Sequence, residues 1–365
     1  MSKPPSVNED FTVSHVVTTQ SPSTLPLLGE PGDIPLADAI LEKVAAAQKI
    51  VITGHERPDG DCLGSEVALC SILRHAGKNA EIINSDPAPR RLQFLLNTPG
   101  ESIPIRTVVP GERIEADLLF VLDATDLKRL GAVRRDQFPN AAAINIDHHL
   151  GNSLFGDINW VDPKSAATGE LIWRLAERCG WAVPAAALTA LYTALVTDTG
   201  QFAYSNTSPR VLRMAAELVE RGVDGEAIWQ TVYLNKTLPE LALEARARAS
   251  LKCAAHGKLC AIFLTADDFS ATQTGPANAE EFSAIPRSLC GVELSLFFYE
   301  INGGAQTKVS ARSTRTADAR ALAQKFGGGG HKQAAGFTLD GTIQDVWRKV
   351  IDEAVLNVEQ GTNTR

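Results

Sequence analysis

The sequence of 365 residues lacks several features that mark particular classes of protein. It has no apolar run long enough to cross a bilayer, and residues 1–33, rich in Ser, Thr and Pro, lack the apolar core of a signal peptide. Positive charge is not in excess, because the net charge is −8 at pH 7. Such a chain has no general field to grip long duplex DNA, although bound divalent metals would supply positive charge locally to a phosphate substrate. We therefore predict a soluble, cytoplasmic protein with neither a membrane nor long duplex DNA as a partner.

Cysteine is also scarce. The six cysteines are scattered and form no Cys-x-x-Cys pair of the kind that binds structural zinc. We expect reduced thiols, as is usual in the cytoplasm. Cys62 lies inside the first motif described below, and we interpret it as a bystander and not as a metal ligand.

The first stretch rich in candidate metal ligands follows a short apolar segment. Ile50–Thr53 is largely β-branched, which predicts a buried strand. Three candidate ligands then lie within seven residues: His55, Asp59 and Asp61. Because Pro58 and Gly60 disfavour helix, we expect a loop here, before a helix from about residue 64 to 76. Taken alone the pattern is ambiguous, since an acidic residue at this position also caps a following helix.

The same arrangement recurs further along the chain. The apolar runs 118–122 and 143–146 are both followed at once by carboxylate or imidazole side chains: Asp123, and Asp147, His148 and His149. A further carboxylate, Asp198, ends an apolar helical stretch. In a parallel α/β sheet ligands bind beyond the carboxyl ends of the strands, so we expect these side chains to converge. Oxygen and imidazole ligands without thiolate suit Mn²⁺, with Mg²⁺ or Fe²⁺ as alternatives, and their number exceeds one closed zinc site. The pattern therefore predicts a two-metal hydrolytic site.

These segments, in this order, resemble the four motifs of the DHH phosphoesterases. They are Gly54-His55-x-x-Pro58-Asp59-Gly60-Asp61, then Asp123, then Asp147-His148-His149, then Asp198-Thr199-Gly200. The run Gly327-Gly328-Gly329-Gly330-His331 resembles the signature of the DHH-associated C-terminal domain. From about residue 35 to 358 the chain is similar to the nano-RNase A type, the bifunctional oligoribonucleases and phosphatases of 3′-phosphoadenosine-5′-phosphate (pAp).

The resemblance implies how the site works. His55, Asp59 and Asp123 would bind one divalent ion, and Asp61, Asp123, His148 and Asp198 would bind the other, with Asp123 bridging. His149 would contact a phosphoryl oxygen or protonate the leaving group, and Asp147 would orient a neighbouring ligand. The implied activity is Mn-dependent hydrolysis of phosphoric esters. Short RNA of two to five nucleotides would be degraded to mononucleotides, and pAp would be dephosphorylated to AMP.

The C-terminal part carries candidate residues for binding the substrate: Arg287, Ser310, Arg312, Gly328, Gly329, Gly330 and His331. Alternation along the predicted strand 307–312 places Ser310 and Arg312 on one face together with Lys308, as phosphate recognition requires. The glycines allow close backbone approach, and successive N–H groups would form a nest for an anion. By resemblance, Arg312 and His331 would hold the terminal phosphate or base of the substrate, and Arg287 would have a weaker role.

Alternating strands and helices predict an α/β fold, with a mostly parallel sheet covered by helices on both faces and a smaller α+β domain at the C-terminal end. The expected divisions are a disordered extension (1–33), the catalytic domain (34–223), a helical connector (224–250), the substrate-binding domain (251–358) and a disordered tail (359–365). Association into a homodimer is left open.

Four alternatives compete with this interpretation. A RecJ-like exonuclease for single-stranded DNA would need further domains and a basic channel. A family II inorganic pyrophosphatase shares the metal motifs but not the glycine-rich signature. A phosphodiesterase of cyclic or linear dinucleotides stays open for a chain without transmembrane and sensor segments. A nucleotide-binding regulatory module without activity would have no need for carboxylates at all four motifs.

Overall fold

The computed structural model describes residues 33–98, 100–314 and 317–362. The chain divides into two compact units, one ending at Leu234 and the other beginning at Asn235. No helix within the described ranges is long and apolar enough to cross a membrane. The extension predicted at 1–33 lies, except for its last residue, outside the described residues.

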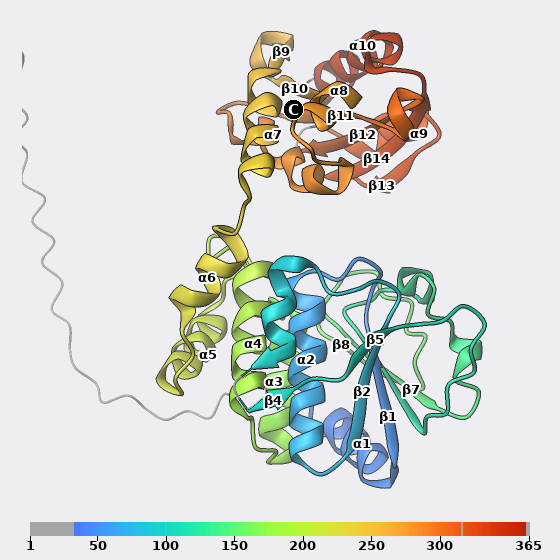
Figure 1. The fold of residues 1–365 in the computed structure, drawn as a ribbon, viewed down its shortest axis with the longest axis vertical. Coiled ribbons are helices and arrows are strands. Elements are labelled where there is room, and N and C mark those ends of the chain that lie inside the picture. The colour runs from blue at the N-terminus through green and yellow to red at the C-terminus, as the bar shows by residue number, and fades with distance from the viewer. Residues whose placement is uncertain (1–32, 99, 315–316, 363–365) are drawn as a thin grey trace, which may run out of the picture. The chain divides into compact units, whose positions relative to one another are not determined.

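The first unit is built on a six-stranded sheet in which every pair of neighbouring strands is parallel (Figure 1). Its strands, in spatial order, are β5 (Ile105–Thr107), β2 (Asn79–Asn84), β1 (Lys49–Thr53), β6 (Leu118–Leu122), β7 (Ala142–Asp147) and β8 (Ile158–Val161). The chain runs outward from β1 to β2 and then returns to β6 on the other side of β1. The strand order therefore reverses between β1 and β6, which is where a parallel sheet gathers its ligand-binding residues. A small two-stranded sheet is formed by β3 (Asn97–Thr98) and β4 (Glu101–Ser102).

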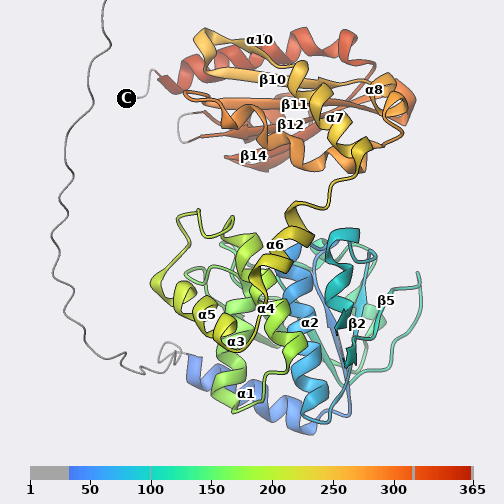
Figure 2. The ribbon, with the colours of Figure 1, turned by 60° about the vertical axis from the view of Figure 1, so that its left-hand side comes forward.

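Helices of this unit lie on one side of the sheet, some packed on the strands and others on neighbouring helices. They are α1 (Asp33–Ala46), α2 (Gly60–His75), α3 (Thr168–Cys179), α4 (Ala185–Asp198), α5 (Pro209–Glu220) and α6 (Gly225–Tyr233). Sheet residues such as Ile52 and Phe120 form one apolar core with α2, α3 and α4. Helices α2 and α4 lie side by side (Figures 1 and 2), and they approach closely at Gly64, where a Cβ would lie only 2.6 Å from the carbonyl oxygen of Ala190.

The opposite face of the sheet is covered by loops and short turns and not by the helices that were predicted. Val51 and Val121 pack there against Leu130 and Phe138, which belong to loops and short 3-10 turns. None of the described α-helices contributes a residue to this second core. The mostly parallel sheet with helices is confirmed, but the expected helices on both faces are replaced on one of them by turns.

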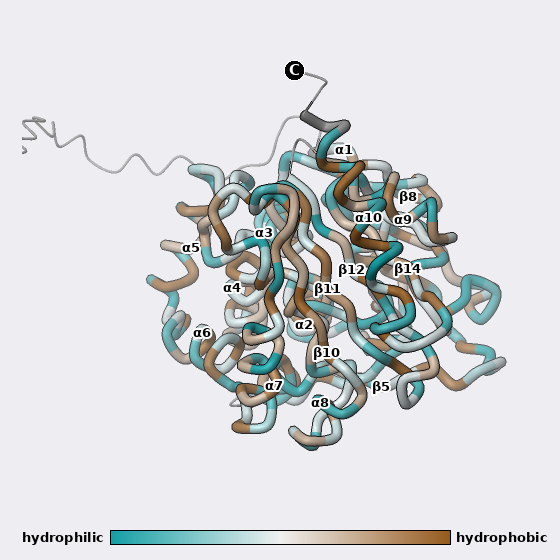
Figure 3. The backbone as a smooth tube through the Cα atoms, turned by 90° about the horizontal axis from the view of Figure 1, so that it is seen from above, coloured by the Kyte–Doolittle hydropathy of each residue, from teal (hydrophilic) through white to brown (hydrophobic). Residues whose placement is uncertain are grey.

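The second unit contains a mixed six-stranded sheet. Its strands, in spatial order, are β13 (Gly329–His331), β14 (Ala334–Asp340), β12 (Gln306–Ser313), β11 (Leu294–Ile301), β10 (Leu259–Leu264) and β9 (Lys252–Ala254). Only β10 and β11 pair in parallel. Hydrophobic residues dominate these two strands (Figure 3). The helices are α7 (Leu238–Ala249), α8 (Ala266–Ala271), α9 (Ala319–Lys325) and α10 (Ile343–Thr362). The predicted α+β character is confirmed.

Three local features differ from the sequence expectations. The connector expected at 224–250 consists of α6 and α7, which belong to different units. Residues 359–362, expected in a disordered tail, continue α10, whose apolar stripe extends to Val358. Cys253 and Cys260 form a disulfide where reduced thiols were expected. The two residues are directly opposite each other on β9 and β10, a proximity that is set by strand register and not by a sequence motif.

Candidate metal centre

The first motif lies between β1 and α2. Asp59 caps the helix, because its side chain accepts hydrogen bonds from the backbone N–H groups of Asp61 at 3.1 Å and Cys62 at 3.0 Å. The helix begins at Gly60, so Asp61 lies in its first turn and not in a loop as predicted. Glycine at position 60 is required by close packing, since a Cβ there would lie 2.4 Å from the side chain of Thr197.

Asp61 is buried and is held by the start of α3. One of its oxygens accepts hydrogen bonds from the Ser65 hydroxyl and the Gly169 N–H, both at 3.0 Å, and the other accepts from the Thr168 N–H at 2.7 Å. The amino end of a helix favours a carboxylate. Burial and the nearby charge of Asp123 nevertheless raise the pKa of Asp61 well above its usual value. The hydrogen bonds from the start of α3 therefore do not fully offset the burial of this carboxylate.

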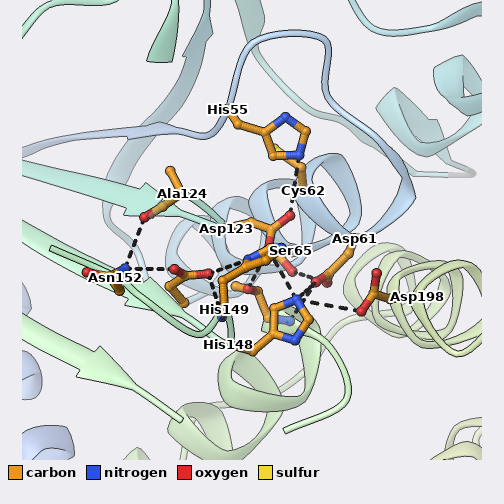
Figure 4. A network of polar contacts seen from close by, with 12 residues as sticks. His55, Asp61, Cys62, Ser65, Asp123, Ala124, His148, His149, Asn152 and Asp198 are labelled. Carbon is orange, nitrogen blue, oxygen red and sulfur yellow. Dashed lines mark hydrogen bonds and ion pairs between the residues drawn. The ribbon is translucent and has the colours of Figure 1, made fainter. Parts of the chain in front are cut away.

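Asp123 stands between two groups of ligands. It follows β6 with φ at 56°, a strained conformation that costs on the order of 1–3 kcal/mol and persists only where the surroundings hold it. Its Oδ2 lies 3.4 Å from Nε2 of His55, while its Oδ1 lies 3.5 Å from Nε2 of His148 (Figure 4). The hydroxyl of Thr168 donates to Oδ1 at 3.0 Å. The two oxygens of one buried carboxylate thus face different imidazoles.

Each of these imidazoles presents one nitrogen to the carboxylates because the backbone occupies the other. Nδ1 of His55 lies 2.8 Å from the carbonyl oxygen of the next residue, and Nδ1 of His148 lies 3.2 Å from that of Ser165. Donation by Nδ1–H leaves Nε2 as a lone pair, the form that binds metals. Nε2 of His148 is buried and has no hydrogen-bond partner among the described residues. It lies 3.6 Å from oxygens of both Asp61 and Asp198.

The separations fit ligands around shared cations better than direct hydrogen bonds. The imidazole nitrogens lie 3.4–3.8 Å from the carboxylate oxygens, whereas N–H···O bonds span about 2.7–3.2 Å. Two ligand atoms each about 2.1 Å from one ion, at right or tetrahedral angles, lie about 3.0–3.4 Å apart. Three groups of described residues could hold an ion: His55, Cys62 and Asp123; Asp61, His148 and Asp198; and Asp123, His148 and His149. The buried, unpartnered nitrogen of His148 and the surrounding oxygens therefore fit a divalent cation.

The charges of the cluster also fit a bound divalent cation. Burial, together with the charges of Asp123 and Asp59, raises the pKa of Asp198 to about 6. Burial opposes a charge on His55, but the nearby carboxylates of Asp123 and Asp59 raise its pKa. Burial likewise opposes a charge on Asp59, while the same contact with His55 lowers its pKa to about 2. Several carboxylates share a small buried volume, so a bound cation would relieve their repulsion.

His149 lies at the edge of the cluster and is held by Asp147. Its Nδ1 donates to Oδ1 of Asp147 at 2.8 Å, and the other oxygen of Asp147 accepts from the Asn152 amide at 2.7 Å. The hydrogen bond to Asp147 raises the pKa of His149 to about 9. The His149 side chain is 47% exposed, so a protonated imidazole faces solvent beside the carboxylates.

The imidazole of His148 is surrounded by supporting residues that the sequence interpretation missed. Arg174 is buried and donates to Asp162 at 2.7 Å and to the Ser165 hydroxyl at 2.9 Å. The carbonyl of Ser165 in turn holds His148. Thr168 contacts two of the buried carboxylates. Thr168 opens α3, and helix N-termini bind carboxylates.

In the second unit, β12 has the polar face that was predicted from its alternating sequence. Lys308, Ser310 and Arg312 alternate with fully buried residues, so all three lie on the less buried face. Burial and the nearby guanidinium of Arg287 lower the pKa of Arg312. No described carboxylate forms an ion pair with Arg287 or Arg312. Two unpaired guanidinium groups close together favour an anionic ligand.

The end of the glycine-rich run, Gly329–His331, forms the strand β13, whereas Gly327 lies in the turn after α9. Gly329 and Gly330 belong to β13, which pairs with β14, so part of the expected anion nest is engaged in the sheet. Close approach explains the composition, since a Cβ on Gly328 would lie 2.3 Å from the carbonyl oxygen of Gly336. His331 ends β13, and only its backbone is within the described structure. The role of this run in substrate binding stays a prediction.

Comparisons with known proteins agree on one family. The model of the DHH family N-terminal domain matches residues 49–195, and the model of the DHHA1 domain matches residues 267–359. The bifunctional oligoribonuclease and PAP phosphatase NrnA of Thermus thermophilus is 34% identical over 307 residues, which is 84% of this chain and 89% of that protein. The protein of the same name from Bacillus subtilis is 26% identical over 304 residues, 82% and 92% of the two chains. The crystal structure of an exopolyphosphatase-related protein from Bacteroides fragilis matches with a TM-score of 0.78 and 27% identity, covering 88% of this chain and 95% of that one.

Proposed function

The chain belongs to the DHH phosphoesterase family, and we propose that it hydrolyses short oligoribonucleotides to mononucleotides and removes the 3′ phosphate of pAp. Two relatives named bifunctional oligoribonuclease and PAP phosphatase, matched over most of their length, support this choice of substrates. We further propose that the reaction depends on two divalent ions, most favourably Mn²⁺, and takes place in the cytoplasm. Mn²⁺ suits a ligand set of carboxylate oxygens and imidazole nitrogens.

One observation carries the proposal of two metals. The opposite oxygens of Asp123 face His55 on one side and His148 on the other, as expected of a carboxylate shared between two ions. The proposed ligands are His55, Asp59 and Asp123 for one ion, and Asp61, Asp123, His148 and Asp198 for the other. When bound, such ions would turn a water molecule into a nucleophile at neutral pH and offset the charge that develops on the phosphoryl oxygens.

Residues of the chain itself would hold the metal ligands in place and donate a proton to the reaction. The N–H groups at the start of α3 fix both oxygens of Asp61, and the Thr168 hydroxyl fixes Asp123. Asp147 occupies Nδ1 of His149, which leaves Nε2–H free to meet a phosphoryl oxygen or the leaving group. A pKa of about 9 keeps His149 protonated at neutral pH, as a proton donor needs.

The second unit is proposed to bind the substrate. Arg312 and Arg287 would attract a phosphate group, with Ser310 and Lys308 beside Arg312 on β12. Arginine suits this role because its planar guanidinium binds phosphate through two parallel hydrogen bonds. The backbone of Gly328, Gly329 and Gly330 and the residue His331 complete the proposed set.

The test is a Mn²⁺-dependent assay that compares pAp, RNA of two to five nucleotides, long single-stranded DNA and pyrophosphate. We expect turnover of the first two. Asp123→Asn should lower it by about 1000-fold, because several kcal/mol of charge stabilisation depend on the ions. Asp136→Asn, at a side chain that is 67% exposed and forms an ion pair with Arg134, is the matched control.

Two results would contradict the proposal. A preference for long DNA or pyrophosphate would replace the substrate assignment by one of the alternatives that share the metal motifs. A folded Asp123→Asn protein with the turnover of the wild type would remove the shared carboxylate from the mechanism.

A further inference from the structure

Cys62 lies within the group of metal ligands, in the first turn of α2. The ligand atoms of His55, Cys62 and Asp123 all lie within 4.8 Å of one another, and all three residues are buried. Figure 4 shows the Cys62 side chain beside the imidazole of His55. A thiol in this position can reach the same ion as the other two side chains.

The backbone of the first motif leaves room for this sulfur. A Cβ on Gly54 would lie 2.3 Å from Sγ of Cys62 and 2.6 Å from Oε1 of Glu66. The thiol donates to that same Glu66 oxygen at 3.8 Å, and the other oxygen of Glu66 accepts from the Asn84 amide at 2.8 Å. The sulfur therefore has a defined position next to the imidazole.

Cys70 shows what a purely structural thiol looks like in the same helix. It is fully buried like Cys62, but its thiol donates to the backbone carbonyl of Ala80 at 3.6 Å, and it belongs to none of the candidate metal groups. The two cysteines are alike in burial and helix, and they differ in the chemistry of their neighbours. Cys70 is thus a matched control.

We propose that Cys62 is a further ligand of the ion held by His55, Asp59 and Asp123, and that it makes this position selective for a borderline-soft divalent ion such as Zn²⁺, Fe²⁺ or Co²⁺. Thiolate ligands favour these ions over Mn²⁺. The inference rests on the proposed two-metal function and divides its two positions by chemistry. The other position offers only oxygen and nitrogen ligands and keeps the preference for Mn²⁺. Coordination requires the thiolate, so binding releases the thiol proton to solvent.

The test uses cobalt as the probe. The full-length protein is stripped of metal and titrated with Co²⁺, whose visible bands report binding by any ligand set and whose near-ultraviolet charge-transfer band reports a thiolate ligand. We expect both signals in the wild type. Cys62→Ala should lose the near-ultraviolet band and keep the visible ones, whereas Cys70→Ala and Cys290→Ala should keep both. Competition titrations should show the preference for Zn²⁺ over Mn²⁺ falling by about 10- to 100-fold in Cys62→Ala.

The outcomes separate this inference from the proposed function. Visible bands without the near-ultraviolet band in the wild type, or the same near-ultraviolet band in Cys62→Ala, would overturn the thiolate ligand and leave the two-metal site standing. No cobalt binding at all would overturn both. Cys62→Ser, which keeps the size of the side chain, replaces Cys62→Ala if circular dichroism shows that the alanine variant is unfolded. It should also lose the near-ultraviolet band.

Discussion

Neutralising Asp198 should stabilise the protein when metal is withheld. Its carboxylate lies at the carboxyl end of α4, where the helix dipole disfavours negative charge, and near the charges of Asp123 and Asp59. Among the described contacts, its side chain has only the ion pair with His148, at 3.6 Å. Asp198→Asn therefore removes a costly charge, keeps the size of the side chain and breaks no described hydrogen bond except this weak contact.

The magnitude follows from the pKa of Asp198. Burial raises it from 3.8 to about 6, and a shift of two pKa units corresponds to about 3 kcal/mol. The side chain is 32% exposed, so screening by solvent reduces the expected gain to about 2 kcal/mol at pH 8. Because the folded pKa is the higher one, the penalty is absent below pH 3.8, grows as pH rises to about 6 and is complete above it. The gain should therefore fall to about half at pH 5.

The assay is urea unfolding of the full-length protein with EDTA, followed by tryptophan fluorescence. This signal reports mainly the first unit, which holds four of the five tryptophans: Trp160, Trp173, Trp181 and Trp229. With saturating Mn²⁺ the wild type should instead have the higher free energy of unfolding, because asparagine is a poorer ligand than aspartate. Asp136→Asn should change the free energy of unfolding by less than about 1 kcal/mol in either condition. Equal or lower stability of Asp198→Asn with EDTA at pH 8, or a gain that does not shrink at pH 5, would refute the reasoning.

Three further substitutions test the supports of the site and the second unit. Arg174→Met should lower the free energy of unfolding by about 3–5 kcal/mol in urea titrations, because it leaves buried partners unpaired. It should also weaken Mn²⁺ binding by about 10- to 100-fold in calorimetry. Arg178→Ala, at an exposed position on the same helix, should change neither quantity. Gly64→Ala should cost about 1–3 kcal/mol by the same unfolding assay, since its Cβ would press on α4, and an unchanged midpoint would argue against that contact. Arg312→Ala should raise KM for pAp by about 10- to 100-fold with little change in kcat, whereas Arg320→Ala, exposed on α9, should leave KM unchanged.

The convergence of the ligands could be predicted because it follows from topology. His55, Asp123 and His148 each come within two residues of the end of a short strand. Parallel strands place their carboxyl ends at one edge, so residues distant in sequence must meet there. Asp198 ends an apolar helical stretch and not a strand, so the strand argument does not place it at this edge, and its role as a ligand is implied by the resemblance to a family.

The support of the ligands could not be predicted, because it depends on how helices dock. Arg174 sits on a helix whose pattern is apolar on one face, and nothing local indicates that a charged side chain there is buried against Asp162. The turns on the second face of the sheet have a clearer cause. Between β6 and β7 the chain contains Gly131, Pro139 and many charged residues, which leave no apolar stripe for a helix.

The carboxylate cluster has an energetic cost that metal binding is able to offset. Asp61 and Asp198 both have raised pKa values, and Asp123 holds a strained backbone, so each lowers the stability of the folded chain. An ion present at 100 times its dissociation constant stabilises the folded chain by about 2.7 kcal/mol. This is close to the penalty expected for Asp198 alone. Folding stability and metal occupancy are therefore linked in this protein. A substitution that stabilises the chain with EDTA should weaken it as a catalyst, because the charges that destabilise the cluster are the ones that bind the ions.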